Sequence, residues 1–231
     1  MTKLIDLVSN EITDEQKKLP VIIPIGLIEA HGPHLPLSVD LDTADYFSKK
    51  TCEKTGAILA PMINYGFADE MAEYVGTIGV KPETLTNMIT DICNHFCSQG
   101  FKKIVILSGH GANQSPCEMA FWKVWETYPE LKIVYWNYWT AANMTHIHHA
   151  DKGETEIAMA VGTTCDLSKA KDFIVNKPWY KLRSRSVIEP TSGGINGNPT
   201  EANLVEGEVV RDEIIRILCK KVSIIIEEDL E

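Results

Sequence analysis

The chain has 231 residues, of which 44% are hydrophobic, and it carries a formal net charge of -10 at pH 7. The acidic charge argues against nucleic acid and anionic membranes as partners, because both attract basic surfaces. No apolar run reaches the roughly 18 residues that a membrane span needs, and the N-terminus lacks the layout of a signal peptide, so we expect a cytoplasmic protein.

Strands and helices are predicted to alternate along the chain. In chain order, the apolar patterns predict a strand at residues 21–25, a helix at 43–54, a strand at 57–63, a helix at 85–96, a strand at 104–107, a helix at 115–128, a strand at 133–136 and helices at 154–161 and 208–227. Residues 166–203 show no pattern that assigns an element. The alternation predicts an α/β fold with a mostly parallel sheet covered on both faces, because parallel neighbours need crossover helices. No linker interrupts the chain, which indicates one domain over residues 1–231.

Two of the predicted helices carry terminal signals. Gly100 follows the helix at 85–96 and is expected to end it. Ser115 is expected to be the N-cap of the next helix, with Pro116 at the first helical position and Glu118 three residues after the serine.

A carboxylate and an imidazole follow the first predicted strand. Glu29 and His31 are two residues apart, so on an extended chain their side chains point to the same side. Asp40 comes nine residues after His31. Carboxylates and imidazoles that converge at a strand end are typical ligands of transition metals, so this segment predicts part of a metal site.

A further histidine follows the strand at 104–107. His110 stands between Gly109 and Gly111, which permit backbone conformations that a side chain would block. In open α/β sheets, ligands bind outside the carboxyl ends of the strands. We therefore expect His110 to reach the same edge of the sheet as Glu29 and His31.

Three histidines and a glutamate precede or begin the helix at 154–161, namely His146, His148, His149 and Glu154. The histidines are open to two interpretations, a polar surface loop or a functional site. Glu154 is equally open, because the helix dipole stabilises a carboxylate in the first turn whatever else the residue does.

Taken together, five separated motifs resemble the creatininase (creatinine amidohydrolase) family. The first motif begins with Glu29-Ala30-His31-Gly32-Pro33-His34. The match as a whole covers roughly residues 20–207, with the motifs in order. The segments are residues 29–37 with Asp40, 74–77, 109–113, 149–155 and 194–200. The resemblance implies a three-layer α/β/α fold, a two-metal centre and a homohexamer.

Carried over to this sequence, the family's metal centre assigns a role to each ligand. Glu29 and His31 would each bind one ion, Asp40 would bridge the two ions, and His110 would be a second ligand of the ion held by Glu29. Mixed imidazole and carboxylate ligands suit two divalent ions of Zn, Mn or Fe, and the sequence does not choose among the three.

The chain departs from creatininase around the substrate. Creatininase has a metal-binding glutamate where this chain has Ala112, and Glu154 is our candidate replacement. Its Trp-Asp pair and a nearby glutamate are replaced by Thr145, His146 and His148, so we expect a substrate other than creatinine. Candidate substrate contacts are His34, Gly111, Asn113 and His148.

The expected activity is hydrolysis of a small amide, formamide or cyclic carbonyl compound. Metal ions would polarise the carbonyl and activate a hydroxide, and His149 would act as the acid that protonates the leaving group. Two alternatives stay open: hydrolytic C–C ring opening of a diketo-inositol, and a peptide-binding or maturation protein that uses the same metal site. A closed cavity of a few hundred Å³ would favour a metabolite, and an open groove would favour a peptide.

Overall fold

The computed structural model describes residues 1–68, 70–144, 147–174 and 193–228. These residues form a parallel five-stranded sheet in the order β1-β3-β2-β4-β5. The strands are β1 (Thr2–Lys3), β2 (Val21–Ile25), β3 (Ile58–Leu59), β4 (Lys103–Ser108) and β5 (Lys132–Asn137). The α-helices are α1 (Asp14–Lys18), α2 (Val39–Thr55), α3 (Pro82–Ser98), α4 (Gln114–Trp125), α5 (Tyr138–Ala141), α6 (Lys152–Val161) and α7 (Leu204–Glu227). No helix in these described ranges is both long and apolar enough to cross a membrane.

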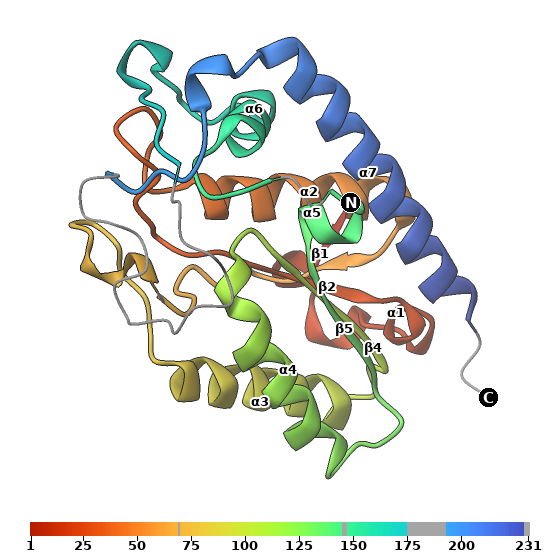
Figure 1. Cartoon of the computed structure of the whole chain (residues 1–231). Helices are drawn as coiled ribbons and strands as arrows, with labels where there is room; N and C mark the ends of the chain where they lie inside the picture. Colours follow the sequence, from red (N-terminus) through yellow and green to blue (C-terminus); the bar gives the residue numbers. More distant parts are fainter. Residues whose placement is uncertain (69, 145–146, 175–192, 229–231) are drawn as a thin grey trace.

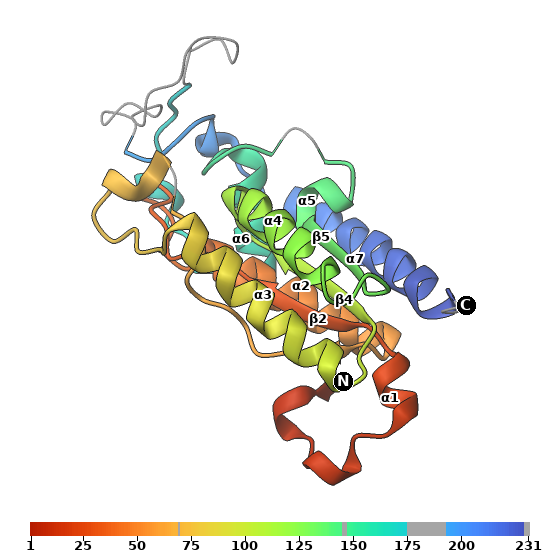
Figure 2. The same cartoon turned by 90° about the horizontal axis from the view of Figure 1, so that it is seen from below.

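Helices cover both faces of the sheet, with α3 and α4 on one face and α2, α5, α6 and α7 on the other (Figure 1). Figure 2 shows α3 and α4 lying side by side. Alternate residues of β2 explain the two layers: Val21 and Ile23 pack into the core under α3 and α4, whereas Ile22 packs against α2 and α7. Both faces of the central strands are therefore buried, as parallel sheets require. The predicted three-layer α/β/α fold is confirmed.

The order of the strands creates a crevice at one end of the sheet. From β2 the chain passes through α2 to β3 on one side of β2, and then through α3 to β4 on the other side. Such a reversal of direction leaves an opening outside the carboxyl ends of β2 and β4, between the two connections. Both of these strands end in segments that carry predicted metal ligands.

The strand predictions hold best at the centre of the sheet. β2 has the predicted bounds, and β4 and β5 are each slightly longer than predicted. The predicted strand at 57–63 is shorter, because β3 covers only Ile58–Leu59 and an isolated bridge joins Ile63 to Ile25. Pro61 lies between these paired residues and has no N–H group to donate to a ladder.

Several helices begin at an earlier residue than predicted, because the residue that caps each helix lies further upstream in the chain. α6 begins at Lys152 with Asp151 as its N-cap, and α7 begins at Leu204 with Asn203 as its N-cap. α2 begins at Val39, which places Asp40 in the first helical turn.

The predicted N-cap of α4 is wrong. The helix begins at Gln114, directly after a 3-10 turn over Gly111–Asn113, so Ser115 is already helical. Asn113 occupies the cap position without a side-chain cap bond, because its amide is used elsewhere. The helix also ends at Trp125, before the predicted residue 128.

Of the two glycines that flank His110, only Gly109 is required by its surroundings, and not because of its φ. Neither residue has a positive φ, so neither requires the left-handed conformation. A Cβ on Gly109 would overlap the carbonyl oxygen of Asp40 and lie 2.8 Å from Thr43 Oγ1. On Gly111 the nearest atom would be Cζ2 of Trp139, at an ordinary 3.7 Å. Gly109 therefore allows the end of β4 to approach the start of α2.

We predict that Gly109→Ala lowers the free energy of unfolding by about 1–3 kcal/mol, as overpacking of a tight contact does. Gly111→Ala is the matched control and should change it by less than about 0.5 kcal/mol, because that residue is exposed and its Cβ has room. Urea denaturation in the presence of a chelator measures both effects. Equal effects of the two substitutions would contradict the close approach at Gly109.

Candidate functional site

Six polar side chains meet outside the carboxyl ends of β2 and β4. Two follow β2, one follows β4, one lies in the first turn of α2, one in the turn before α6 and one in the first turn of α6. Five of them are buried, and the last histidine of the set is partly exposed. The six are Glu29, His31, Asp40, His110, His149 and Glu154.

Asp40 presents one carboxylate oxygen to each of two imidazoles. Its Oδ2 lies 3.2 Å from Nδ1 of His110, and that nitrogen also lies 3.1 Å from Oε2 of Glu29. Its Oδ1 lies 3.3 Å from Nε2 of His31, which in turn lies 3.6 Å from Oε2 of Glu154. The side chains thus form two donor groups, Glu29–Asp40–His110 and His31–Asp40–Glu154, that share Asp40.

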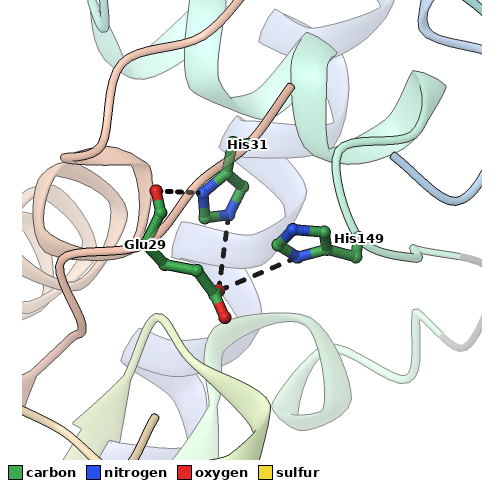
Figure 3. Close-up of side chains that lie close together, drawn as sticks. All are labelled: Glu29, His31 and His149. Atoms are coloured by element: carbon green, nitrogen blue, oxygen red, sulfur yellow. Dashed lines mark hydrogen bonds and ion pairs between the residues drawn. The ribbon is translucent and has the colours of Figure 1, made fainter. Parts of the chain in front are cut away.

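His149 approaches the same carboxylates from the turn before α6. Figure 3 shows the Glu29 carboxylate directed toward both His31 and His149. Oε2 of Glu29 lies 3.9 Å from Nε2 of His31 and 3.8 Å from Nδ1 of His149. These three residues form a third group whose donor atoms are close enough to hold an ion together.

Backbone carbonyl groups orient all three imidazoles. In each ring one nitrogen contacts a carbonyl oxygen, and the other faces the carboxylates. If the first nitrogen carries the proton and donates it, the second has a free lone pair, which is the usual arrangement of metal-binding histidines. The contacts are His31 Nδ1 with Glu29 O at 3.0 Å, His110 Nε2 with Phe67 O at 3.1 Å, and His149 Nε2 with Ala30 O at 2.9 Å.

The buried polar atoms at the centre of the site fit a cation. Both carboxylate oxygens of Glu29, Nε2 of His31 and Oδ2 of Asp40 are buried without a hydrogen-bond partner among the described residues. Burying such atoms unpaired is costly, and burying several carboxylates together adds repulsion. Divalent cations would satisfy these atoms, and mixed imidazole and carboxylate donors suit Zn, Mn or Fe.

Charge coupling within the site is strong. Burial by itself would lower the pKa of His31, but Glu154 and Asp40 outweigh it and raise that pKa well above its usual value. Burial likewise opposes protonation of His110, whose pKa Glu29 and Asp40 nevertheless raise. Burial would raise the pKa of Asp40, yet the two imidazoles hold it below its usual value. Because imidazoles bind metal ions only in the neutral form, a cation at this site would compete with protons.

The donor groups open into a cavity of about 200 Å³. Gly111 and His148, two of the predicted substrate contacts, line it. The sequence prediction missed its apolar walls, Met71, Trp139 and Ile147. Trp139 could have been found, because it follows β5 and so reaches the same edge of the sheet. Met71 lies in a short 3-10 helix (Glu70–Glu73) between β3 and α3, and no sequence pattern pointed to it.

The other two predicted substrate contacts do not line this cavity. His34 is buried, and its Nε2 contacts Oγ1 of Thr155 at 3.0 Å. Asn113 is also buried, and its Oδ1 accepts a hydrogen bond from the Phe67 N–H at 2.8 Å while its amide nitrogen donates to the Gly26 carbonyl. Both side chains thus tie together the segments around the site. His146 and Thr145 lie outside the described residues.

Known proteins resemble this chain in sequence. The family model for creatininase, described as creatinine amidohydrolase, matches residues 6–222. The chain is 25% identical over 212 residues to a mycofactocin precursor peptide peptidase of Mycolicibacterium smegmatis, which covers 84% of this chain and 81% of that protein. It is 33% identical over 92 residues to a 3-dehydro-scyllo-inosose hydrolase of Thermotoga maritima, which covers 39% of this chain and 30% of that protein.

Solved structures agree with the family model. A crystal structure of creatinine amidohydrolase (creatininase) matches with a TM-score of 0.85 at 20% identity and covers 99% of both chains. Creatininase structures of the same fold include a Zn-Zn form of a variant, with a TM-score of 0.85, 19% identity and 98% of both chains covered. They also include a Mn form, with a TM-score of 0.86 and 19% identity, which covers 98% of this chain and 99% of the other. The chain therefore belongs to the creatininase family of metal-dependent hydrolases.

Proposed function

We propose that this protein hydrolyses a small amide, formamide or cyclic carbonyl compound with two transition-metal ions. The observation that carries the proposal is the position of Asp40, whose two carboxylate oxygens face two separate donor groups. A shared carboxylate of this kind is what a two-metal centre requires. Assembly as a homohexamer and a cytoplasmic location stay predictions from the sequence.

The proposed ligand sets follow the two donor groups. Glu29 and His110 would hold one ion and His31 and Glu154 the other, with Asp40 between them. When bound, such a pair of ions polarises a carbonyl group and lowers the pKa of a water molecule. The protein's part is to hold the ligands in place, which it does by burying them and by orienting each imidazole through a backbone carbonyl.

Glu154 supports this assignment by its place in the structure. The position where creatininase has a glutamate is Ala112 here, which lines the cavity and offers no ligand atom. Glu154 brings a carboxylate from α6 to within 3.6 Å of Nε2 of His31. Its pKa is below the usual value, because the charges of His31 and His149 outweigh its burial. The carboxylate is therefore ionised and available to a cation.

His149 is our candidate for the proton transfer step. It lines the cavity, its side chain is 19% exposed, and its Nδ1 faces the Glu29 carboxylate. Because Nε2 is held by the Ala30 carbonyl, a proton would be accepted and released at Nδ1. General acid catalysis by an imidazole in this position would protonate the leaving group.

The lining of the cavity favours a substrate whose reacting group is small and uncharged. No lysine or arginine is among the described residues that line it, so these residues offer no fixed positive charge to a substrate carboxylate. Its volume of about 200 Å³ suits a small molecule better than an extended peptide. The apolar side chains of Met71, Trp139 and Ile147 would enclose the part of the substrate that does not react.

A peptide substrate is the second candidate, and one observation favours it. The relative that matches 84% of this chain is named as a peptidase for a precursor peptide. Hydrolytic C–C cleavage of a ring is a further alternative, supported by the shorter match to 3-dehydro-scyllo-inosose hydrolase. A small cavity can still admit the end of a peptide, so the assay has to include all three substrate classes.

The test is a substrate screen with purified protein loaded with Zn, Mn or Fe. The panel contains formamides, lactams, cyclic diketones and short peptides, and Asp40→Ala serves as the inactive control. Turnover of a formamide or lactam that depends on metal and on Asp40 would support the proposal. Turnover of peptides or cyclic diketones alone would replace it with the corresponding alternative.

We predict about two metal ions per chain in protein purified without a chelator. Asp40→Ala should lose both ions, because both donor groups use this carboxylate. Glu29→Ala should spare the ion held by His31 and Glu154. Elemental analysis by plasma mass spectrometry measures the content. A protein that binds no ion after reconstitution with Zn or Mn would end the hydrolase hypothesis.

Glu154→Gln should remove the ion that His31 and Glu154 share, leaving about one ion per chain. The matched control is Glu156→Gln, on the same helix and equally buried at 5% exposure, whose Oε1 accepts from the Asn203 N–H and contacts Lys152. The control should keep both ions. If Glu154→Gln also kept both ions and full activity, Glu154 would be only a charge at a helix N-terminus.

His149→Ala should lower kcat by about 10²–10⁴, the usual contribution of general acid–base catalysis, while both ions stay bound. His148→Ala is the neighbouring comparison and should change the preference among substrates, since His148 lines the cavity. Steady-state kinetics with parallel metal analysis separates the two roles. Loss of an ion in His149→Ala, with unchanged turnover per bound ion, would make His149 a ligand instead.

A further inference from the structure

A buried carboxylate outside the proposed ligand sets holds the turn that carries His149. Asp151 is 5% exposed and precedes α6. Its Oδ2 accepts a hydrogen bond from the His148 N–H at 2.9 Å, and its Oδ1 accepts one from the Glu154 N–H at 2.8 Å. One side chain thus bonds to the backbone on both sides of the turn, next to the two residues that act in the site.

The turn between these two bonds has an unfavourable backbone conformation. Ala150 has a φ of 49°, in the left-handed region that residues with a Cβ rarely adopt. Its N–H donates to Oε2 of Glu154, the same oxygen that faces His31. A non-glycine residue keeps such a conformation only where its surroundings hold it there.

The rest of the turn is fixed from outside. The Asn196 N–H donates to the His149 carbonyl at 2.9 Å. Gly197 packs so closely on Asp151 that a Cβ on the glycine would overlap the aspartate side chain. Asp151 therefore lies between the turn, the first turn of α6 and the segment around residue 197.

We propose that Asp151 is a positioning residue that locks the His149 turn to the first turn of α6. Through its two hydrogen bonds it sets the place of the His149 ring relative to the Glu154 carboxylate. The importance of His149 in this inference rests on the proposed function. The two hydrogen bonds of Asp151 do not depend on that function.

The proposal explains why this cap is a carboxylate. Serine and asparagine are N-caps about as good as aspartate, so a residue that only capped α6 could be either of them. Two oxygens that both accept from N–H groups are available only in a carboxylate, since an asparagine amide has one acceptor oxygen and a serine has one short hydroxyl. Substitution by serine or asparagine thus separates capping from positioning.

The experiment compares Asp151→Ser and Asp151→Asn with the wild-type protein, in the metal-free and the Zn-loaded forms. The matched control is Asp166→Ser, at an exposed aspartate that caps a 3-10 turn through the Ser168 N–H. Four quantities are measured: melting temperature, metal content, hydrogen exchange of the His148 amide, and the NMR signal of the His149 ring. The ring signal is assigned by its loss in His149→Gln.

We expect Asp151→Ser to keep the melting temperature and the metal content, because the cap of α6 remains. The His148 amide should exchange about tenfold faster, which corresponds to the loss of one hydrogen bond. The His149 ring signal should shift or broaden, and kcat on any substrate found should fall about tenfold at unchanged KM. Asp166→Ser should show none of these changes.

Unchanged exchange at His148 and an unchanged His149 signal in both Asp151 variants would overturn the proposal. A parallel loss of melting temperature and metal in both variants would also overturn it, since Asp151 would then act through the whole helix. These outcomes are distinct from failure of the proposed function, which would appear as wild-type protein without metal or turnover. The exchange and NMR measurements decide the role of Asp151 in that case as well.

Discussion

The candidate site depends on the carboxylate of Asp40, because its two oxygens face two different imidazoles. Asp40 offers one oxygen to His31 and the other to His110, and so joins a segment that follows β2 to a segment that follows β4. This double contact is possible because α2 begins at Val39, early enough to place Asp40 in its first turn beside both strand ends. Glu29 and Glu154 each belong to one of the two donor groups that share Asp40.

The close grouping of buried acids is costly for the folded protein. Glu29, Asp40 and Glu154 are each at most 5% exposed, and carboxylates buried this closely repel one another. The carboxylates raise the pKa values of His31 and His110. Positive charge on these imidazoles would offset part of the repulsion between the acids. In the proposed function, this cost in stability keeps the ligands preorganised for the ions.

The sequence located those site residues that directly follow a predicted strand. Glu29, His31 and His110 could be placed together because each follows a strand that the apolar pattern identifies, and parallel strands end at one edge. His34 and Asn113 look equally polar in the sequence, but Nε2 of His34 contacts Thr155, and the Asn113 amide bonds to Phe67 and Gly26. The sequence does not show whether a polar side chain points into the cavity or toward a neighbouring segment. It also does not show which connection, such as the one that carries Met71, lines the cavity.

Gly109 lets the backbone next to His110 approach the backbone of Asp40 closely, because a Cβ there would overlap the Asp40 carbonyl oxygen. Transition-metal ions differ in radius, so an exchange of one ion for another needs small changes in ligand spacing. If Glu29 and Glu154 are ligands, as we propose, their carboxylate groups at the ends of longer side chains would supply these changes. A change of ion at the proposed centre would then alter the positions of the ligands and leave the close contact between β4 and α2 as it is.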